Sequence, residues 1–101
     1  MIHVIASVSI KHGRRGEFLE IFRTNVRNVL MENGCIEYRP AVDVDAGLDP
    51  QALDENLVTV IEKWESLEDL YAHLSAPHML DYREKVGSMV EGVVLKVLED
   101  A

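Results

Sequence analysis

The sequence predicts an α+β domain of the ferredoxin-like type, in which a four-stranded antiparallel sheet carries helices on one face. Two observations support this prediction. Apolar residues recur at every second position in some segments and at spacings of three and four in others, which are the periods of strands and helices. These segments follow one another as strand, helix, strand, strand, helix pair and strand, which is the split βαβ order.

Residues 2–10 form the first predicted strand. Every second side chain is apolar and indicates one buried face: Ile2, Val4, Ala6, Val8 and Ile10. A helix is predicted over about residues 14–32, where Phe18, Leu19, Phe22, Val26, Val29 and Leu30 form one apolar stripe. Asn33-Gly34 is expected to end this helix, because both residues tolerate the left-handed conformation.

The second strand is predicted over about residues 35–44. Pro40 lacks a backbone N–H, so this strand is expected to be an edge strand or to carry a bulge there. Residues 45–55 form an acidic loop that is long for a compact domain, and they suggest either a lid or an arm over a neighbouring subunit. Residues 57–64 form the third strand, which is apolar on both faces in its first half.

A pair of helices is predicted between the third and fourth strands. Ser66 is expected to cap the first of them, with Asp69 as its partner three residues later. Ser75 is expected to cap the second helix, with Pro77 in its first turn. Residues 93–98 then form the fourth strand.

The apolar residues on the second face of this sheet need a cover. A two-fold homodimer that pairs two such sheets is the commonest way to provide one. We therefore expect a homodimer that pairs two sheets and encloses a small-molecule pocket.

Composition limits the class of partner. The length of 101 residues fits one domain, residues 1–101. The net charge of −8 repels phosphate backbones and anionic lipids, so neither nucleic acid nor a membrane is an expected partner. No apolar run approaches the roughly 18 residues of a membrane span, and the first residues lack a signal-peptide pattern. Cys35 is the single cysteine and cannot form an internal disulfide, which favours a cytoplasmic location.

Four short segments resemble, in order and spacing, those of the antibiotic biosynthesis monooxygenase (ABM) family. The resemblance covers nearly the whole chain, from Met1 to about Leu98. The segments are Gly34-Cys35-Ile36-Glu37-Tyr38, the polar Asn56 that opens the third strand, Glu62-Lys63-Trp64-Glu65-Ser66, and the His-containing helix junction Ala72-His73-Leu74 with Ala76-Pro77-His78.

The resemblance implies a dimeric α+β barrel with a pocket between the sheet and the helices of each subunit. Many members of this family oxidise phenols, quinols or polyketide anthrones with molecular oxygen and use no metal, flavin or haem. Arg83 stands nearest to the position of the histidine ligand in haem-degrading relatives, which argues against haem. Val58 and Ile61 replace aromatic residues common in the family, which argues against a large flat substrate stacked there.

Two histidines are the candidate catalytic bases, because imidazole titrates near neutral pH and cofactor-free oxygenation needs a base in a dry pocket. His73 and His78 flank the helix break, which could turn both toward a cavity. In the alternative interpretation, one stabilises the junction and the other lies at the surface. A metal site is not expected, because their five-residue spacing fits one helical face poorly.

Three further residues are candidates for binding substrate. Trp64 either lines the pocket with its indole N–H or is a core aromatic residue. Asn56 either orients a substrate oxygen or makes a turn, and Tyr82 points into the pocket or packs in the helix layer.

Three functions are consistent with these residues. The first is a cofactor-independent monooxygenase acting on a quinol or another small phenolic. The second is an isomerase that uses the same histidines to move a proton in a hydroxyketone. The third is a non-catalytic dimeric module that binds a metabolite.

Overall fold

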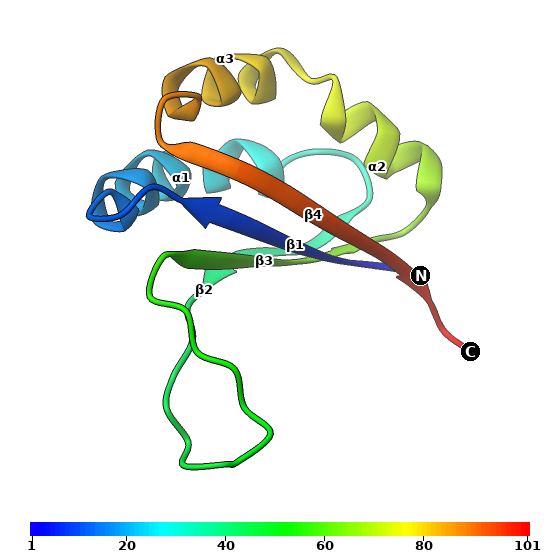
Figure 1. Ribbon diagram of the computed structural model, residues 1–101. Helices are drawn as coiled ribbons and strands as arrows, with labels where there is room; N and C mark the ends of the chain where they lie inside the picture. The colour runs from blue at the N-terminus through cyan, green and yellow to red at the C-terminus, as the bar shows by residue number, and fades with distance from the viewer.

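The computed structural model describes all residues from Met1 to Ala101. Figure 1 shows a sheet with all three helices on one face, which confirms the predicted α+β, ferredoxin-like fold class. The elements in order are β1 (Ile2–Ile10), α1 (Arg15–Leu30), β2 (Cys35–Ala41), β3 (Leu57–Trp64), α2 (Leu67–Leu74), α3 (Pro77–Val86) and β4 (Val90–Glu99). None of the helices is long and apolar enough to cross a membrane.

The four strands pair antiparallel in the order β2-β3-β1-β4. β2 is therefore an edge strand, as the missing N–H of Pro40 requires. The register shift in this strand lies between Cys35 and Glu37 instead of at Pro40. Because of this shift, Cys35 and Tyr38 both pair with inward-facing residues of β3, and Tyr38 is buried.

The core lies between the sheet and the helices. On β1, the five residues of the predicted apolar face are all buried and alternate with partly exposed ones. α1 contributes the buried Phe18, Phe22 and Val29. Trp64 and His73 are among the largest fully buried side chains. Burial of a phenylalanine side chain such as Phe18 or Phe22 contributes about 1.5–3 kcal/mol through its removal from water.

Several predicted boundaries are wrong by a few residues. α1 ends at Leu30, two residues early, and the second strand ends at Ala41 instead of residue 44. β4 begins at Val90, three residues before its predicted start, because it continues directly from the turn after α3. These differences arise at element ends, where local propensity is weakest.

The predicted helix starts have different outcomes. Ser66 caps α2, with its Oγ accepting the backbone N–H of Asp69 at 3.2 Å and donating to the Asp69 carboxylate at 2.9 Å. Pro77 occupies the first turn of α3, as expected. The predicted cap by Ser75 is wrong: Ala76 is the N-cap residue and makes no side-chain bond, while Ser75 ends α2 and donates to the carbonyl of Ala72.

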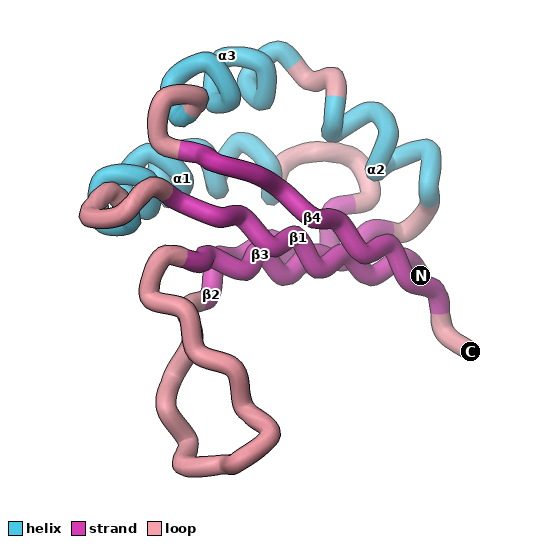
Figure 2. Tube along the Cα trace, in the orientation of Figure 1, coloured by secondary structure: helices cyan, strands magenta, loops and turns pink.

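Residues 42–56 join β2 to β3 and extend far from the rest of the molecule, and we call this segment the arm. It leaves the sheet on the side opposite the helices (Figures 1 and 2). Side chains of the arm bond its own backbone. The Asp43 carboxylate accepts the N–H of Asp54 at 2.8 Å, and Gln51 accepts from Ala46 and donates to the carbonyl of Val44.

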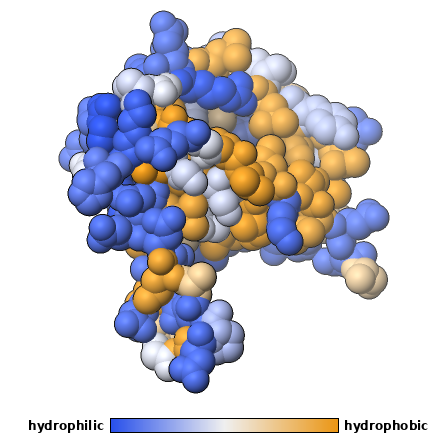
Figure 3. All heavy atoms as spheres, viewed as in Figure 1, coloured by the Kyte–Doolittle hydropathy of each residue, from blue (hydrophilic) through white to orange (hydrophobic).

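β4 is exposed on both faces along almost its whole length. Its apolar residues Val93, Val94, Leu95, Val97 and Leu98 are between 46% and 67% exposed. Figure 3 shows apolar side chains gathered over this strand. A soluble monomer seldom leaves so many apolar residues together in water, and an exposed patch of this kind is typical of an interaction surface.

Candidate active site

The larger candidate site is an apolar cavity of about 460 Å³ between the sheet and the helices. Its size falls within the range of small-molecule pockets. Ala6, Val8 and Val60 come from the sheet, Phe22 from α1, and Met79, Tyr82 and Val86 from α3. Val93 and Leu95 of the exposed β4 also line it, together with Tyr38, Leu74, Arg83, Gly87 and Val90.

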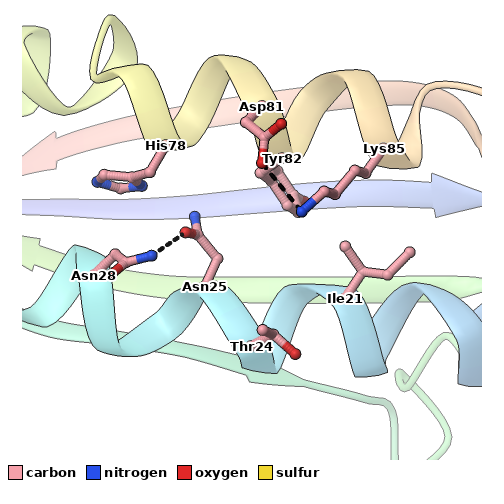
Figure 4. Close-up of a pocket in the computed structure, with 8 residues that line it drawn as sticks. All are labelled: Ile21, Thr24, Asn25, Asn28, His78, Asp81, Tyr82 and Lys85. Atoms are coloured by element: carbon pink, nitrogen blue, oxygen red, sulfur yellow. Dashed lines mark hydrogen bonds and ion pairs between the residues drawn. The ribbon is translucent and has the colours of Figure 1, made fainter.

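A smaller, polar cavity of about 260 Å³ lies between α1 and α3. Figure 4 shows His78 pointing from α3 toward Asn25 and Asn28 of α1, whose side chains bond each other at 2.9 Å. Tyr82 lines both cavities and therefore forms part of the wall between them. Ile21, Thr24, Asp81 and Lys85 complete the lining.

Glu32 brings the two predicted catalytic histidines together. This residue follows the end of α1, and its Oε2 lies 2.9 Å from Nδ1 of His73 on α2 and 3.1 Å from Nε2 of His78 on α3. The first contact is a hydrogen bond. The second is poorly aligned, so both buried ring nitrogens of His78 are left without a hydrogen-bond partner. One carboxylate oxygen therefore faces both imidazoles.

His73 is enclosed by aromatic rings. Its ring centroid lies 4.7 Å from that of Trp64 and 5.3 Å from that of Tyr38. Burial lowers the pKa of His73, an effect that the hydrogen bond and the charge of Glu32 partly oppose. The neutral imidazole donates Nδ1–H to the carboxylate of Glu32, which leaves Nε2 as a proton acceptor.

A second carboxyl group, which is buried, lies beside this cluster. Glu62 is only 7% exposed, and its Oε1 accepts the indole N–H of Trp64 at 3.0 Å. Burial raises the pKa of Glu62 to about 7, the hydrogen bond from Trp64 lowers it, and the charge of Glu32 raises it. Burial, with a contribution from the charge of Glu62, likewise raises the pKa of the Tyr38 and Tyr82 hydroxyls, which stay protonated at neutral pH.

The structure gathers four of the five predicted site residues around these features. His73 and His78 meet at Glu32, Trp64 packs on His73, and Tyr82 lines both cavities. His78 lines the polar cavity, whereas His73 lies behind Tyr38, which forms the cavity wall. Trp64 lines neither cavity, and its N–H is occupied by Glu62, so this residue is a core aromatic as the alternative interpretation held.

Asn56 lies apart from the other four. It precedes β3, whose far end carries Trp64, and eight strand residues span about 26 Å. The backbone of Asn56 bonds Ile10 and the Asp54 side chain, as in a turn. Its side chain lines a shallow polar depression with His12, Gly13, Arg15, Gly16 and Glu55.

Sequence reasoning missed Glu32 and Glu62. Glu62 had a signal, because it occupies an inward position in the alternation of β3, between Val60 and Trp64. A lone carboxylate on a buried strand face is costly unless it has a partner or a function. Glu32 had no such signal, since only the tertiary fold brings it to the histidines. No three His, Cys, Asp or Glu residues are arranged to hold a metal ion.

The profile of the family described as "Antibiotic biosynthesis monooxygenase" matches residues 1–85. The chain belongs to this family. Among curated ABM relatives, a protein of Escherichia coli (strain K12) named "Probable quinol monooxygenase YgiN" is 38% identical over 101 residues, covering 98% of this chain and 97% of the relative. The resemblance inferred from the four short segments is thereby confirmed.

Solved structures carry the same ABM-type fold. A conserved protein from Methanosarcina mazei Go1 superposes with a TM-score of 0.84 at 18% identity and covers 99% of this chain and 92% of its own. Rv0793 from Mycobacterium tuberculosis gives a TM-score of 0.80 at 23% identity, covering 99% and 94%. At these identities, the likeness is one of fold.

Proposed function

We propose that this ABM-family protein is a cofactor-independent monooxygenase that oxidises a quinol or another small phenolic with molecular oxygen. The observation that carries the proposal is the apolar cavity of about 460 Å³ with a neutral, carboxylate-paired His73 behind its wall. The name of the Escherichia coli relative, a probable quinol monooxygenase, supports the same substrate class.

The reaction needs a base and a dry site. Ground-state oxygen is a triplet, so the substrate must first become an anion that can give up one electron. One quinol and one O₂ give a hydroxyquinone and water, which balances all atoms. The cavity lining is almost entirely apolar, so it would offer water few hydrogen-bond partners beside the radical pair formed after electron transfer.

His73 and His78 are the proposed bases for the phenol proton. His78 has free ring nitrogens and lines a cavity with Tyr82. His73 has a free Nε2 and contacts Tyr38, whose ring forms part of the apolar cavity wall. A proton gained by either histidine would be stabilised by the same Glu32 carboxylate. Tyr82 would contact the substrate from the wall that the two cavities share.

We further propose that two chains pair through the outer face of the sheet, the face away from the helices. By register, this face carries Ile5, Leu57, Ile61, Val94 and Leu98. Covering these residues would remove apolar surface from water.

The decisive experiment measures oxygen uptake by the purified protein over a panel of quinols and hydroxyarenes, against autoxidation blanks. His73→Gln and His78→Gln are the test variants. His12→Gln, in an exposed histidine remote from both cavities, is the matched control. Removing the functional base should reduce kcat/KM by roughly 10²–10⁴-fold. Uptake no faster than the blank on every substrate would refute the oxygenase, and turnover of a hydroxyketone without oxygen would establish the isomerase instead.

A further inference from the structure

We propose that the apolar cavity selects an aromatic acid, a quinol or phenol that carries a carboxylate, and that Arg83 of α3 binds this carboxylate. The inference names the substrate class of the proposed function and rests on that function for the phenolic ring. The acid group can be tested by binding alone. The position of Arg83, its lack of a partner and its effect on neighbouring groups support the assignment.

Arg83 occupies an inward position of α3. Met79, Tyr82 and Val86 line the apolar cavity from this helix. Arg83 lines the cavity as well, and the spacings of three and four among these residues place them on one face of the helix. Met79 and Val86 are buried, whereas Arg83 is exposed. Arg83 therefore lies where the cavity opens to solvent.

The charge of Arg83 has no counterpart in the cavity. Arg83 is the only charged residue in the lining, and it takes part in none of the ion pairs of the chain. Lys85, the other basic residue of α3, instead pairs with Asp81 at 3.1 Å. The aliphatic stem of an arginine suits an apolar wall, while its guanidinium stays in water. The N–H donors of Arg83 are thus available to a ligand at the cavity mouth.

Arg83 also acts on polar groups of the cavity wall and behind it. Burial raises the pKa of the Tyr82 hydroxyl, and the charge of Arg83 opposes this rise. Burial lowers the pKa of His73, and the charge of Arg83 acts in the same direction. Both effects are those of a nearby cation, which favours negative charge and disfavours positive charge. An anionic group on a ligand at the mouth would be stabilised in the same way.

The chemistry of the lining points to a carboxylate on an aromatic ring. The planar guanidinium matches the two oxygens of a carboxylate with parallel hydrogen bonds. One cation balances a carboxylate, whereas a phosphate with a charge of about −2 would be left partly unbalanced. The apolar remainder of the lining suits the ring. The net charge of −8 opposes anions only weakly here, because salt screens carboxylates beyond about 8 Å.

Isothermal titration calorimetry with 2-naphthoate and 2-naphthamide tests the proposal. The two probes have nearly the same shape and differ in charge. We expect the wild type to bind the naphthoate about 5–10-fold more tightly, between the effects of an exposed ion pair and a buried charged hydrogen bond. Arg83→Met, which keeps an apolar stem, should abolish this preference and leave naphthamide binding unchanged.

Two further variants complete the binding experiment. Arg83→Gln should also lose the preference, and it decides alone if Arg83→Met fails to fold. The control is Arg23→Met, which replaces an exposed arginine on α1 that lines neither cavity. This control should keep the preference of the wild type.

Oxygen uptake with a carboxylated naphthoquinol and its carboxamide tests the same assignment during turnover. Arg83→Met should raise KM for the acid by the factor found in binding and leave its kcat unchanged. A residue that binds the acid group away from the reacting carbons contributes equally to the ground state and the transition state.

The possible outcomes separate the acid site from the oxygenase. Equal affinities of the wild type for the two probes would overturn the inference, as would a preference that survives in both Arg83 variants. A preference that these variants lose and Arg23→Met keeps would support it, even if no quinol is oxidised and the oxygenase falls. Oxygen uptake without any preference for the acid would leave the oxygenase standing and overturn the role of Arg83.

Discussion

The Glu32 carboxylate accepts a hydrogen bond of 2.9 Å from Nδ1–H of His73, although the two residues lie 41 positions apart in the chain. The same oxygen lies 3.1 Å from Nε2 of His78. A partly buried acceptor in this position fixes the tautomer of one histidine and provides the counter-charge for both. Glu32 is thus a positioning residue in the proposed mechanism, because it acts through the imidazoles.

Replacing this carboxylate with an amide should lower activity and shift its pH dependence. In Glu32→Gln, the side chain keeps its shape but loses the charge that holds the pKa of His73 up against burial. If His73 is the base, the acid limb of the kcat/KM profile should move to lower pH. We expect kcat/KM at neutral pH to fall by about 10–100-fold, as for other groups that orient a functional histidine.

The matched control for this variant is Glu20→Gln, which neutralises an exposed glutamate within α1, the helix that Glu32 follows. It should leave both the rate and the pH profile unchanged. A Glu32→Gln protein with a reduced rate but an unshifted acid limb would show that Glu32 has only a structural role.

Glu62 should make the protein less stable as the pH rises. Its pKa is about 7 in the folded chain and 4.5 in the unfolded reference, so between these values the folded state holds a proton that the unfolded state has lost. The contribution of Glu62 to the free energy of unfolding is therefore fully present below pH 4.5 and is lost as the pH rises through 7. The difference corresponds to about 3 kcal/mol.

Urea unfolding of the wild type and Glu62→Gln at pH 5 and pH 8 measures this effect. The amide oxygen can still accept the Trp64 indole N–H, so the variant should be as stable as the wild type at pH 5 and more stable at pH 8. Trp64 is the only tryptophan, and its fluorescence should titrate near pH 7 in the wild type alone. Equal pH dependence in the two proteins would contradict the prediction.

Gly34 should tolerate no side chain. Its φ of +77° favours glycine, and an added Cβ would lie 2.0 Å from Oδ2 of Asp69, the residue that pairs with the Ser66 cap. Gly47 has a similar φ of +73° with open space around it. Gly47→Ala should therefore cost about 1–2 kcal/mol from backbone strain alone.

Gly34→Ala should cost clearly more than Gly47→Ala, because the clash displaces Asp69 at the start of the helix that carries His73. The free energies of unfolding of the two variants, measured side by side in urea, give the difference. Equal losses would show that Asp69 moves aside without cost.

Leu95→Trp should narrow the apolar cavity at its β4 wall. Leu95 is 51% exposed, so the larger ring can be accommodated without disrupting the core. We expect KM to rise several-fold for a two-ring naphthoquinol and to change little for a one-ring benzoquinol. Leu80→Trp on α3, which lines neither cavity, is the control. A KM that Leu95→Trp leaves unchanged for both substrates would place the substrate elsewhere.

The fold class was predictable because each element carries a local signal. The alternation in β1 and the apolar stripe of α1 follow from burial on one side of an element. The Ser66 cap was predictable because its partner lies three residues away. Element ends were less predictable: Ser75 resembles a cap but bonds backward to Ala72, since Ala76 and Pro77 begin the next helix.

The candidate site was only partly predictable. His73 and His78 stood out by residue type, but their common partner Glu32 belongs to another helix end and requires the tertiary fold. Trp64 was expected either in the pocket or in the core, and only the structure shows its N–H bound to Glu62. Asn56 follows the family pattern in sequence yet lies at the opposite end of β3, a separation that linear spacing does not reveal.

The exposure of β4 has a consequence for the newly made chain. This strand pairs only with β1, so its other edge presents unpaired N–H and C=O groups beside aliphatic side chains on both faces. Such an edge is a template for indiscriminate strand addition and aggregation. Correct assembly would therefore also protect the chain, and variants that weaken it should precipitate at concentrations where the wild type stays clear.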